Sequence, residues 1–143
     1  MMQLLIFKEV SNRIPRSLIQ SLFDMMYQKE VSKKSQGMVN LIFTHDKRLK
    51  ELNSQFRNKD RATDVLSFNI DEPLDSDSIF GEIYISLETA LRQADDYNAT
   101  LSEEIVRLSC HGFLHLLGYD HVDKKDEVVM KSKEEIYLSK VYS

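Results

Sequence analysis

Three histidines fall within residues 111–121, at a spacing that one metal ion can use. His111 and His115 are four residues apart, so on a helix their imidazoles lie on one face and can converge on one point. Gly118 can end that helix in the left-handed region, which reverses the chain and brings His121 toward the other two. Three neutral imidazoles bind a zinc-like ion and leave one position open for water or substrate. The pattern therefore predicts a catalytic metal site.

The alternative is that these histidines are packed core residues, because two histidines at helical spacing can arise by chance in an apolar helix. Three histidines with a glycine between the second and the third are harder to explain in that way. The chain has four histidines, and only His45 lies outside this segment. His45 stands before Asp46 where a helix is expected to begin, so we expect it to cap that helix locally or to be solvated.

The same spacing occurs in metallopeptidases of the metzincin kind, whose pattern is HExxHxxGxxH. The glutamate after the first histidine is the general base that activates the metal-bound water. Gly112 occupies this position here. Glycine has no side chain that could accept a proton, so the sequence argues against a peptidase.

Residues 111–121, HGFLHLLGYDH, closely resemble the signature HGxLHLxGYDH of the YbeY family of bacterial endoribonucleases. A second match covers residues 52–68, LNSQFRNKDRATDVLSF, followed by GEIYIS at 81–86. The departures are small: Ala62 and Asn69 stand where the family usually has proline, and Glu82 stands where aspartate is common. These positions affect loop stiffness and strand ends rather than the expected chemistry.

The resemblance implies a zinc-dependent endoribonuclease specific for single-stranded RNA, with one Zn²⁺ per chain held by His111, His115 and His121. It also implies maturation of the 3′ end of 16S rRNA, ribosome quality control, and a cytoplasmic location. The implied partners are single-stranded rRNA and the ribosome, with ribosomal or assembly proteins as further candidates and no membrane. An assembly module that uses zinc only as a structural staple stays open as the alternative, together with the disfavoured peptidase.

Arg57 and His111 are the expected catalytic residues. Negative charge builds on the phosphate oxygens in the transition state, and a guanidinium can meet two of these oxygens at once. Arg57 matches the family's functional arginine, and Lys59 and Arg61 are expected to bind the substrate backbone. The alternative for Arg57 is a helix C-terminal residue that interacts only with the helix dipole.

Some steps of the reaction stay open in the sequence. Asp120 is equally suited to accept a hydrogen bond from a ligand imidazole and to cap the turn. The sequence does not distinguish attack by water from attack by the ribose 2′-hydroxyl, and it shows no general acid for the leaving oxygen.

The chain of 143 residues has the length of one domain, which we expect to span residues 1–143. Its single cysteine, Cys110, cannot form an internal disulfide and is expected to be a small buried hydrophobic residue. The apolar run 2–7 is too short for a signal peptide or a membrane span. Residence in the cytoplasm follows as the default expectation.

The net charge of −4 is unusual for a protein that binds RNA, because binding to a polyanion draws on counterion release by basic groups. The charges are segregated, however. Basic residues gather at Lys47, Arg48, Lys50, Arg57, Lys59 and Arg61, and acidic residues at Asp71, Glu72, Asp75, Asp77, Asp123, Asp126, Glu127, Glu134 and Glu135. A solvated face and a phosphate-binding surface are both compatible with the basic cluster, and the family resemblance favours the second.

The elements that position these residues are expected to form an α+β fold, with a mixed sheet of about four strands covered by about five helices. Strands are predicted at about 2–7, 38–44, 65–70 and 79–86, with a parallel crossover between the first two and an antiparallel pairing of the last two. The apolar spacings that predict the first three helices are Leu18, Leu22, Met25 and Met26; then Leu49, Leu52 and Phe56; then Leu87, Ala90, Leu91, Ala94 and Tyr97.

The fourth helix carries the histidines and is expected to be central and buried. Ser86 is the predicted N-cap of the helix before it, and Thr100 with Glu103 forms a capping-box pattern at its own start. From 105 to 117 this helix is apolar on nearly every side. A last helix, from about 123, is expected to cover the sheet or the far side of the site, with Met130 in the core rather than on the metal.

Overall fold

The computed structural model of the chain describes residues 2–31, 37–57, 65–69, 79–119 and 123–143, without the side chains of residues 56, 57, 69, 79 and 80. The elements in chain order are β1 (Met2–Lys8), α1 (Arg16–Glu30), β2 (Gly37–Thr44), α2 (Asp46–Arg57), β3 (Val65–Asn69), β4 (Ile79–Ser86), α3 (Leu87–Asp96), α4 (Leu101–Leu116) and α5 (Lys124–Val141). The α+β architecture predicted from the sequence is confirmed, and the predicted strand ends differ by one residue at most.

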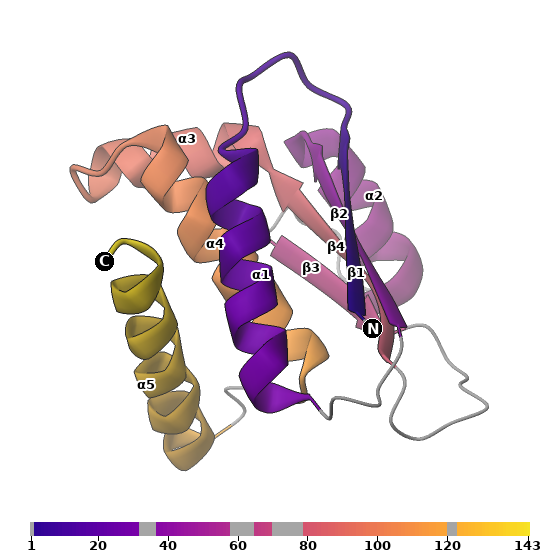
Figure 1. Cartoon of the computed structure of the whole chain (residues 1–143). Coiled ribbons are helices and arrows are strands. Elements are labelled where there is room, and N and C mark those ends of the chain that lie inside the picture. Colours follow the sequence, from indigo (N-terminus) through magenta and orange to yellow (C-terminus); the bar gives the residue numbers. More distant parts are fainter. Residues whose placement is uncertain (1, 32–36, 58–64, 70–78, 120–122) are drawn as a thin grey trace.

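The four strands form one mixed sheet in the order β1-β2-β4-β3. β1 pairs with β2 and β2 with β4 in parallel, whereas β3 pairs with β4 antiparallel. The parallel crossover through α1 and the antiparallel pair near the middle of the chain are therefore both confirmed. β1 and β3 form the two edges, so the sheet presents β2 and β4 to the helices that cover it (Figure 1).

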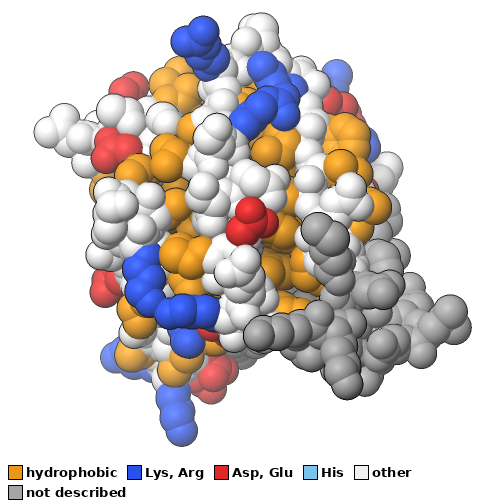
Figure 2. Space-filling view, in the orientation of Figure 1, with side chains coloured by type: hydrophobic (Ala, Val, Ile, Leu, Met, Phe, Trp, Pro, Cys, Tyr) orange, Lys and Arg blue, Asp and Glu red, His pale blue; other side chains and the backbone are white. Residues whose placement is uncertain are grey.

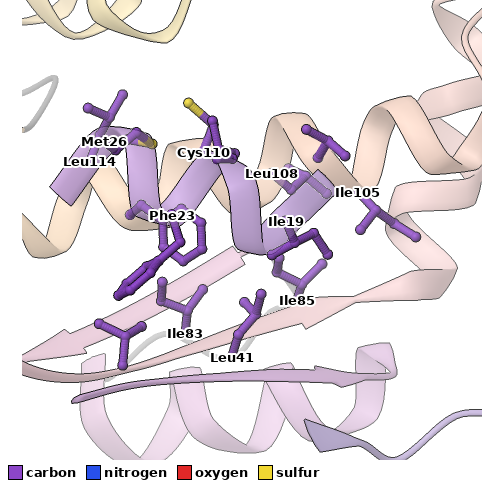
Figure 3. Packing of buried hydrophobic residues seen from close by; sticks show 14 of the residues in the cluster. Ile19, Phe23, Met26, Leu41, Ile83, Ile85, Ile105, Leu108, Cys110 and Leu114 are labelled. Carbon is purple, nitrogen blue, oxygen red and sulfur yellow. The ribbon is translucent and has the colours of Figure 1, made fainter. Parts of the chain in front are cut away.

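Side chains alternate along the strands and build a separate apolar cluster on each face of the sheet. On one face, Leu41, Ile83 and Ile85 point toward α1 and α4, as Figure 3 shows, and all three are fully buried. On the other face, Leu49 and Leu52 of α2 pack against Leu66 of β3. The sheet therefore has α1 and α4 on one side and α2 on the other.

Capping residues in the sequence determine where α3 and α4 begin. The Ser86 side chain accepts a hydrogen bond from the Thr89 N–H and caps α3. At the start of α4, Thr100 accepts from the Glu103 N–H, and the Glu103 carboxylate accepts from the Thr100 N–H, which completes the predicted capping box. Both predictions are confirmed, so α4 enters the core at a defined residue.

Two glycines allow α4 to lie close to β4. A Cβ at Gly112 would lie 2.7 Å from Cγ2 of Ile83, and a Cβ at Gly81 would lie 2.7 Å from Cδ2 of Leu116. Such distances are too short for a real Cβ contact, so both positions depend on the absence of a side chain. Gly112 is thus a packing residue as well as a neighbour of His111.

α5 packs against α1 and α4 rather than on the sheet (Figure 1). Met130 and Tyr137 are its buried residues, in agreement with the core position expected for Met130. The last helix was expected to cover either the sheet or the far side of the site, and its packing against α4 supports the second placement. Cys110 is fully buried, as expected, and burial raises the pKa of its thiol.

Within the described ranges of the chain, no helix combines the length and the apolar character that crossing a membrane requires.

Candidate metal centre

His111 and His115 lie on the same face of α4, and their Nε2 atoms are 3.1 Å apart. Two nitrogens bound to one tetrahedral ion at about 2.05 Å lie about 3.3 Å apart, so the observed separation fits one edge of a tetrahedral zinc site. The ring planes are inclined at 75°, with centroids 4.7 Å apart. A hydrogen bond between the two rings has the same length, so the distance fits a metal without identifying one.

The helix ends just after His115 in a complete Schellman motif. Gly118 has φ of 103°, its N–H donates to the His115 carbonyl at 3.1 Å, and the Tyr119 N–H donates to the Leu114 carbonyl at 3.1 Å. The predicted helix end at Gly118, with this residue in the left-handed region, is therefore confirmed. The next residues, Asp120 and His121, lie outside the described part of the chain.

Tyr119 fixes the turn to two other helices through Glu30, at the end of α1. The Tyr119 hydroxyl donates to Glu30 Oε1 at 2.6 Å, the Tyr137 hydroxyl donates to Oε2, and Lys133 Nζ lies 3.2 Å from Oε2. Partial burial raises the pKa of the Glu30 carboxyl, but these hydrogen bonds outweigh that effect and hold the pKa below its ordinary value. The turn before His121 is thereby tied to α1 and α5.

A polar stripe on α4, consisting of Glu104, Arg107, His111 and His115, runs along one face of this otherwise apolar helix. Arg107 binds Glu104 through two nitrogens, at 2.8 and 2.6 Å. Two residues of the stripe face α5, where Glu134 lies 3.6 Å from Nη1 of Arg107 and 3.7 Å from Nδ1 of His111. The expectation that α4 is apolar on nearly every side therefore needs this correction.

Glu134 is the residue of this site that the sequence analysis missed, since it was counted there only among the acidic residues of the last segment. The spacing i, i+3, i+7 and i+11 from Glu104 to His115 was the available signal, because it places all four residues on one helical face. It indicates a polar stripe that needs partners, although it does not name the helix that provides them.

The remaining predicted site residues are only partly placed. Arg57 is the last residue of α2, and its side chain is outside the description. Lys59, Arg61 and His121 lie in ranges that the structure does not describe. Within the described ranges, no three His, Cys, Asp or Glu side chains converge as a metal site would require, so the third ligand stays a prediction.

β3, the next described element after Arg57, contacts α4. Residues 58–64 connect Arg57 to β3, the edge strand beside β4. On β3 the Ser67 hydroxyl donates to the carbonyl oxygen of Gly112 at 3.5 Å, next to His111. Seven residues thus join the end of α2 to a strand that contacts the histidine helix.

The positive charges in the described residues do not form one basic patch on the side of α1. In that face, lysine and arginine side chains are scattered among hydrophobic and acidic ones (Figure 2). On α2, by contrast, Lys47, Lys50 and Glu51 line a shallow hollow of about 400 Å³ together with Ser54 and Gln55.

His45 precedes α2 and is exposed, which agrees with the solvated position that was one of its two expected roles.

A family model described as Endoribonuclease YbeY matches residues 6–142. The chain belongs to the YbeY family of endoribonucleases. This confirms the resemblance seen in the histidine signature, and membership of the YbeY family makes the chain a hydrolase whose substrate is RNA.

Relatives named Endoribonuclease YbeY align over most of the chain. The protein from Desulforamulus reducens is 42% identical over 123 residues, which are 78% of this chain and 80% of the relative. The protein from Finegoldia magna is 36% identical over 93% of this chain and 81% of its own length. The solution structure of TM1509 from Thermotoga maritima superposes with a TM-score of 0.65 at 33% identity, covering 97% of this chain and 89% of that one.

Proposed function

We propose that this YbeY-family chain is a zinc-dependent endoribonuclease specific for single-stranded RNA, and that it matures the 3′ end of 16S rRNA and acts in ribosome quality control in the cytoplasm. The observation that carries the proposal is the convergence of His111 and His115 Nε2, 3.1 Å apart, directly before the turn that leads to His121. The expected donor set is three imidazoles, which suits zinc and leaves one position open.

His111, His115 and His121 would hold the ion. When bound, the ion would act as a Lewis acid toward a phosphoryl oxygen and would lower the pKa of a water molecule bound to it. Arg57 binds two oxygens of the scissile phosphate and compensates the charge that builds there. Lys59 and Arg61 bind neighbouring phosphates and keep the strand in register. A single strand suits this small site, because its bases can turn aside while the phosphate approaches.

A peptidase is disfavoured for a second reason beyond the missing glutamate. The position after the first histidine faces the sheet, where a Cβ at Gly112 would already lie 2.7 Å from Ile83. A glutamate there would need α4 to move away from β4. The other alternative, an assembly module with a structural zinc, would use the same histidines but would cut no RNA.

The test compares Arg57→Ala with Arg16→Ala, the same change at an arginine outside the basic cluster. Arg16 is exposed at the start of α1, on the opposite side of the sheet from α2. We expect Arg57→Ala to keep one zinc per chain and to cut a single-stranded RNA about 100- to 1000-fold more slowly, the cost of losing a transition-state donor. Arg16→Ala should cut at the wild-type rate, and a chelator should stop cleavage in all forms.

Three results would contradict the proposal in different ways. An unchanged rate in Arg57→Ala would remove this residue from the site. One zinc per chain with no cleavage by any form would favour the assembly module, and proteolysis that a chelator abolishes would favour the peptidase. The rRNA role has its own test: mapping of 16S rRNA 3′ ends in bacteria whose only copy is the wild type or Arg57→Ala.

A further inference from the structure

We infer that Glu134 of α5 is a positioning residue for the metal ligand His111, holding the imidazole in the tautomer that carries its proton on Nδ1. This inference rests on the proposed metal site. A histidine that binds a metal through Nε2 must carry its proton on Nδ1, and a carboxylate facing Nδ1 fixes both the proton and the ring orientation.

The geometry around His111 assigns different roles to its two nitrogens. Nε2 faces His115 at 3.1 Å, whereas Nδ1 faces Oε2 of Glu134 at 3.7 Å. The second distance is longer than a hydrogen bond, and such contacts often shorten when a site is filled. The side chains of His111 and Glu134 are 24% and 15% exposed, so little water competes for this contact.

Glu134 is itself held in place by Arg107. The Nη1 of Arg107 lies 3.6 Å from Oε1 of Glu134, so the two carboxylate oxygens face different partners. Arg107 in turn is fixed by Glu104, whose side chain is only 3% exposed and binds the guanidinium at two points. Burial of an unpaired carboxylate costs desolvation free energy, so the pairing with Glu104 favours a single orientation of Arg107.

The order of these contacts favours positioning over a simple link between helices. An arginine between two carboxylates would be enough to join α4 to α5. Here the second oxygen of Glu134, Oε2, also points at Nδ1 of His111, the nitrogen that must carry the proton when Nε2 binds the metal. The contacts therefore run from Glu104 to Arg107, from Arg107 to Glu134, and from Glu134 to His111, the expected metal ligand.

The experiment measures zinc affinity by competition with a fluorescent chelator in Glu134→Gln and Glu134→Ala. Glu135 is the next residue on α5 and is exposed, so Glu135→Gln and Glu135→Ala are matched controls. We expect Glu134→Ala to bind zinc about 10- to 100-fold more weakly, as is typical for the loss of such a partner. Glu134→Gln keeps an acceptor but no charge and should show a smaller loss, and the Glu135 variants should bind like the wild type.

A second readout separates positioning from a general loss of structure. The ¹⁵N shifts of His111 in the zinc-free protein at alkaline pH report which nitrogen carries the proton. We expect the Nδ1–H tautomer in the wild type and in both Glu135 variants, and a mixture of tautomers in Glu134→Ala. If Glu134→Ala does not fold, Glu134→Gln preserves the volume of the side chain, and its zinc affinity decides the question.

The inference is overturned if the Glu134 variants bind zinc as tightly as the Glu135 variants, or if His111 carries its proton on Nε2 in the zinc-free wild type. In both cases the metal site itself stands as long as the wild type binds zinc. A wild type that binds no zinc would overturn this inference and the proposed function together, so the two failures are distinguishable.

Discussion

Gly112 lies where α4 comes closest to β4, and this makes its replacement by alanine a test of helix packing. Alanine favours a helix by about 1 kcal/mol over glycine. The new Cβ, however, would meet Cγ2 of Ile83 at 2.7 Å and Cδ1 at 3.1 Å, and Cγ2 is attached to a rigid branched carbon. Overpacking of this kind costs about 1–3 kcal/mol. We expect Gly112→Ala to lower the free energy of unfolding by about 1 kcal/mol, measured by urea denaturation.

Ser102→Ala is the control for this prediction, because Ser102 is exposed in the first turn of the same helix. Its effect should stay within about 0.5 kcal/mol, as for other surface positions. If Gly112→Ala instead stabilises the protein by the amount that helix propensity predicts, then α4 can move from β4 at no cost. Gly112 would then have no packing role.

At the scale of residues, the sequence predicted what depends on neighbours along the chain. The shared face of His111 and His115 follows from helical geometry, and the turn at Gly118 follows from the backbone freedom of glycine. Glu134 could not be predicted in this way, because its contact with His111 depends on how α5 packs against α4. The close approach at Gly112 likewise depends on Ile83, which belongs to a distant strand.

At the scale of elements, Glu30 joins three parts of the fold and gives them a common dependence on pH. Its pKa is lowered in the folded chain, so the carboxylate stabilises the fold at pH values above its ordinary pKa. That contribution is lost as the pH falls through the lowered pKa and the group becomes protonated. We expect Glu30→Gln to lower the free energy of unfolding at neutral pH and to matter progressively less in acid.

Urea denaturation of the wild type and Glu30→Gln at a series of pH values between neutrality and about pH 3 measures this difference. Glu135→Gln serves as the control, because Glu135 is exposed on α5. The difference caused by Glu30→Gln should be largest at neutral pH and shrink below the ordinary pKa of a glutamate, about 4.3. A difference that is constant over this range would mean that the charge of Glu30 does not contribute to stability.

The elements themselves were predicted well where one face is apolar or a cap is present. The caps at Ser86 and Thr100 and the alternation in β4 set their boundaries within the chain's own sequence. The sequence does not distinguish the sheet from the far side of the site as the place of α5, because the apolar residues of this helix are spread around it. Val128, Val129 and Ile136 are exposed, whereas Met130 and Tyr137 are buried, so no single face marked the side that packs.

At the scale of the whole molecule, the net charge of −4 and an RNA substrate are compatible only if positive charge is locally concentrated. The face on the side of α1 shows no such concentration (Figure 2). The exposed side of α2, with Lys47 and Lys50, its last residue Arg57, and the following positions of Lys59 and Arg61 are where the sequence places the excess of basic residues. We therefore expect RNA to approach from the side of α2 and to reach α4 past the edge strand β3, which contacts the histidine helix.

Zinc should stabilise the entire fold, because the three histidines proposed as its ligands lie on the core helix α4 and just after the turn that Tyr119 ties to Glu30. A ligand that binds only the folded state at 100 times its dissociation constant adds about 2.7 kcal/mol to the free energy of unfolding. For a chain of this length that corresponds to a rise in Tm of about 10 °C. We expect zinc to raise the Tm of the wild type by this amount, and a chelator to reverse the rise.

His115→Ala and His45→Ala separate specific binding from adventitious binding in this measurement. His45 is exposed at the start of α2, so its removal should leave the zinc-induced rise in Tm unchanged. His115→Ala removes one of two nitrogens that lie 3.1 Å apart and should abolish most of the rise. An equal zinc-induced rise in Tm in both variants would show that zinc binds elsewhere, and would contradict the proposal that the histidines of α4 bind it.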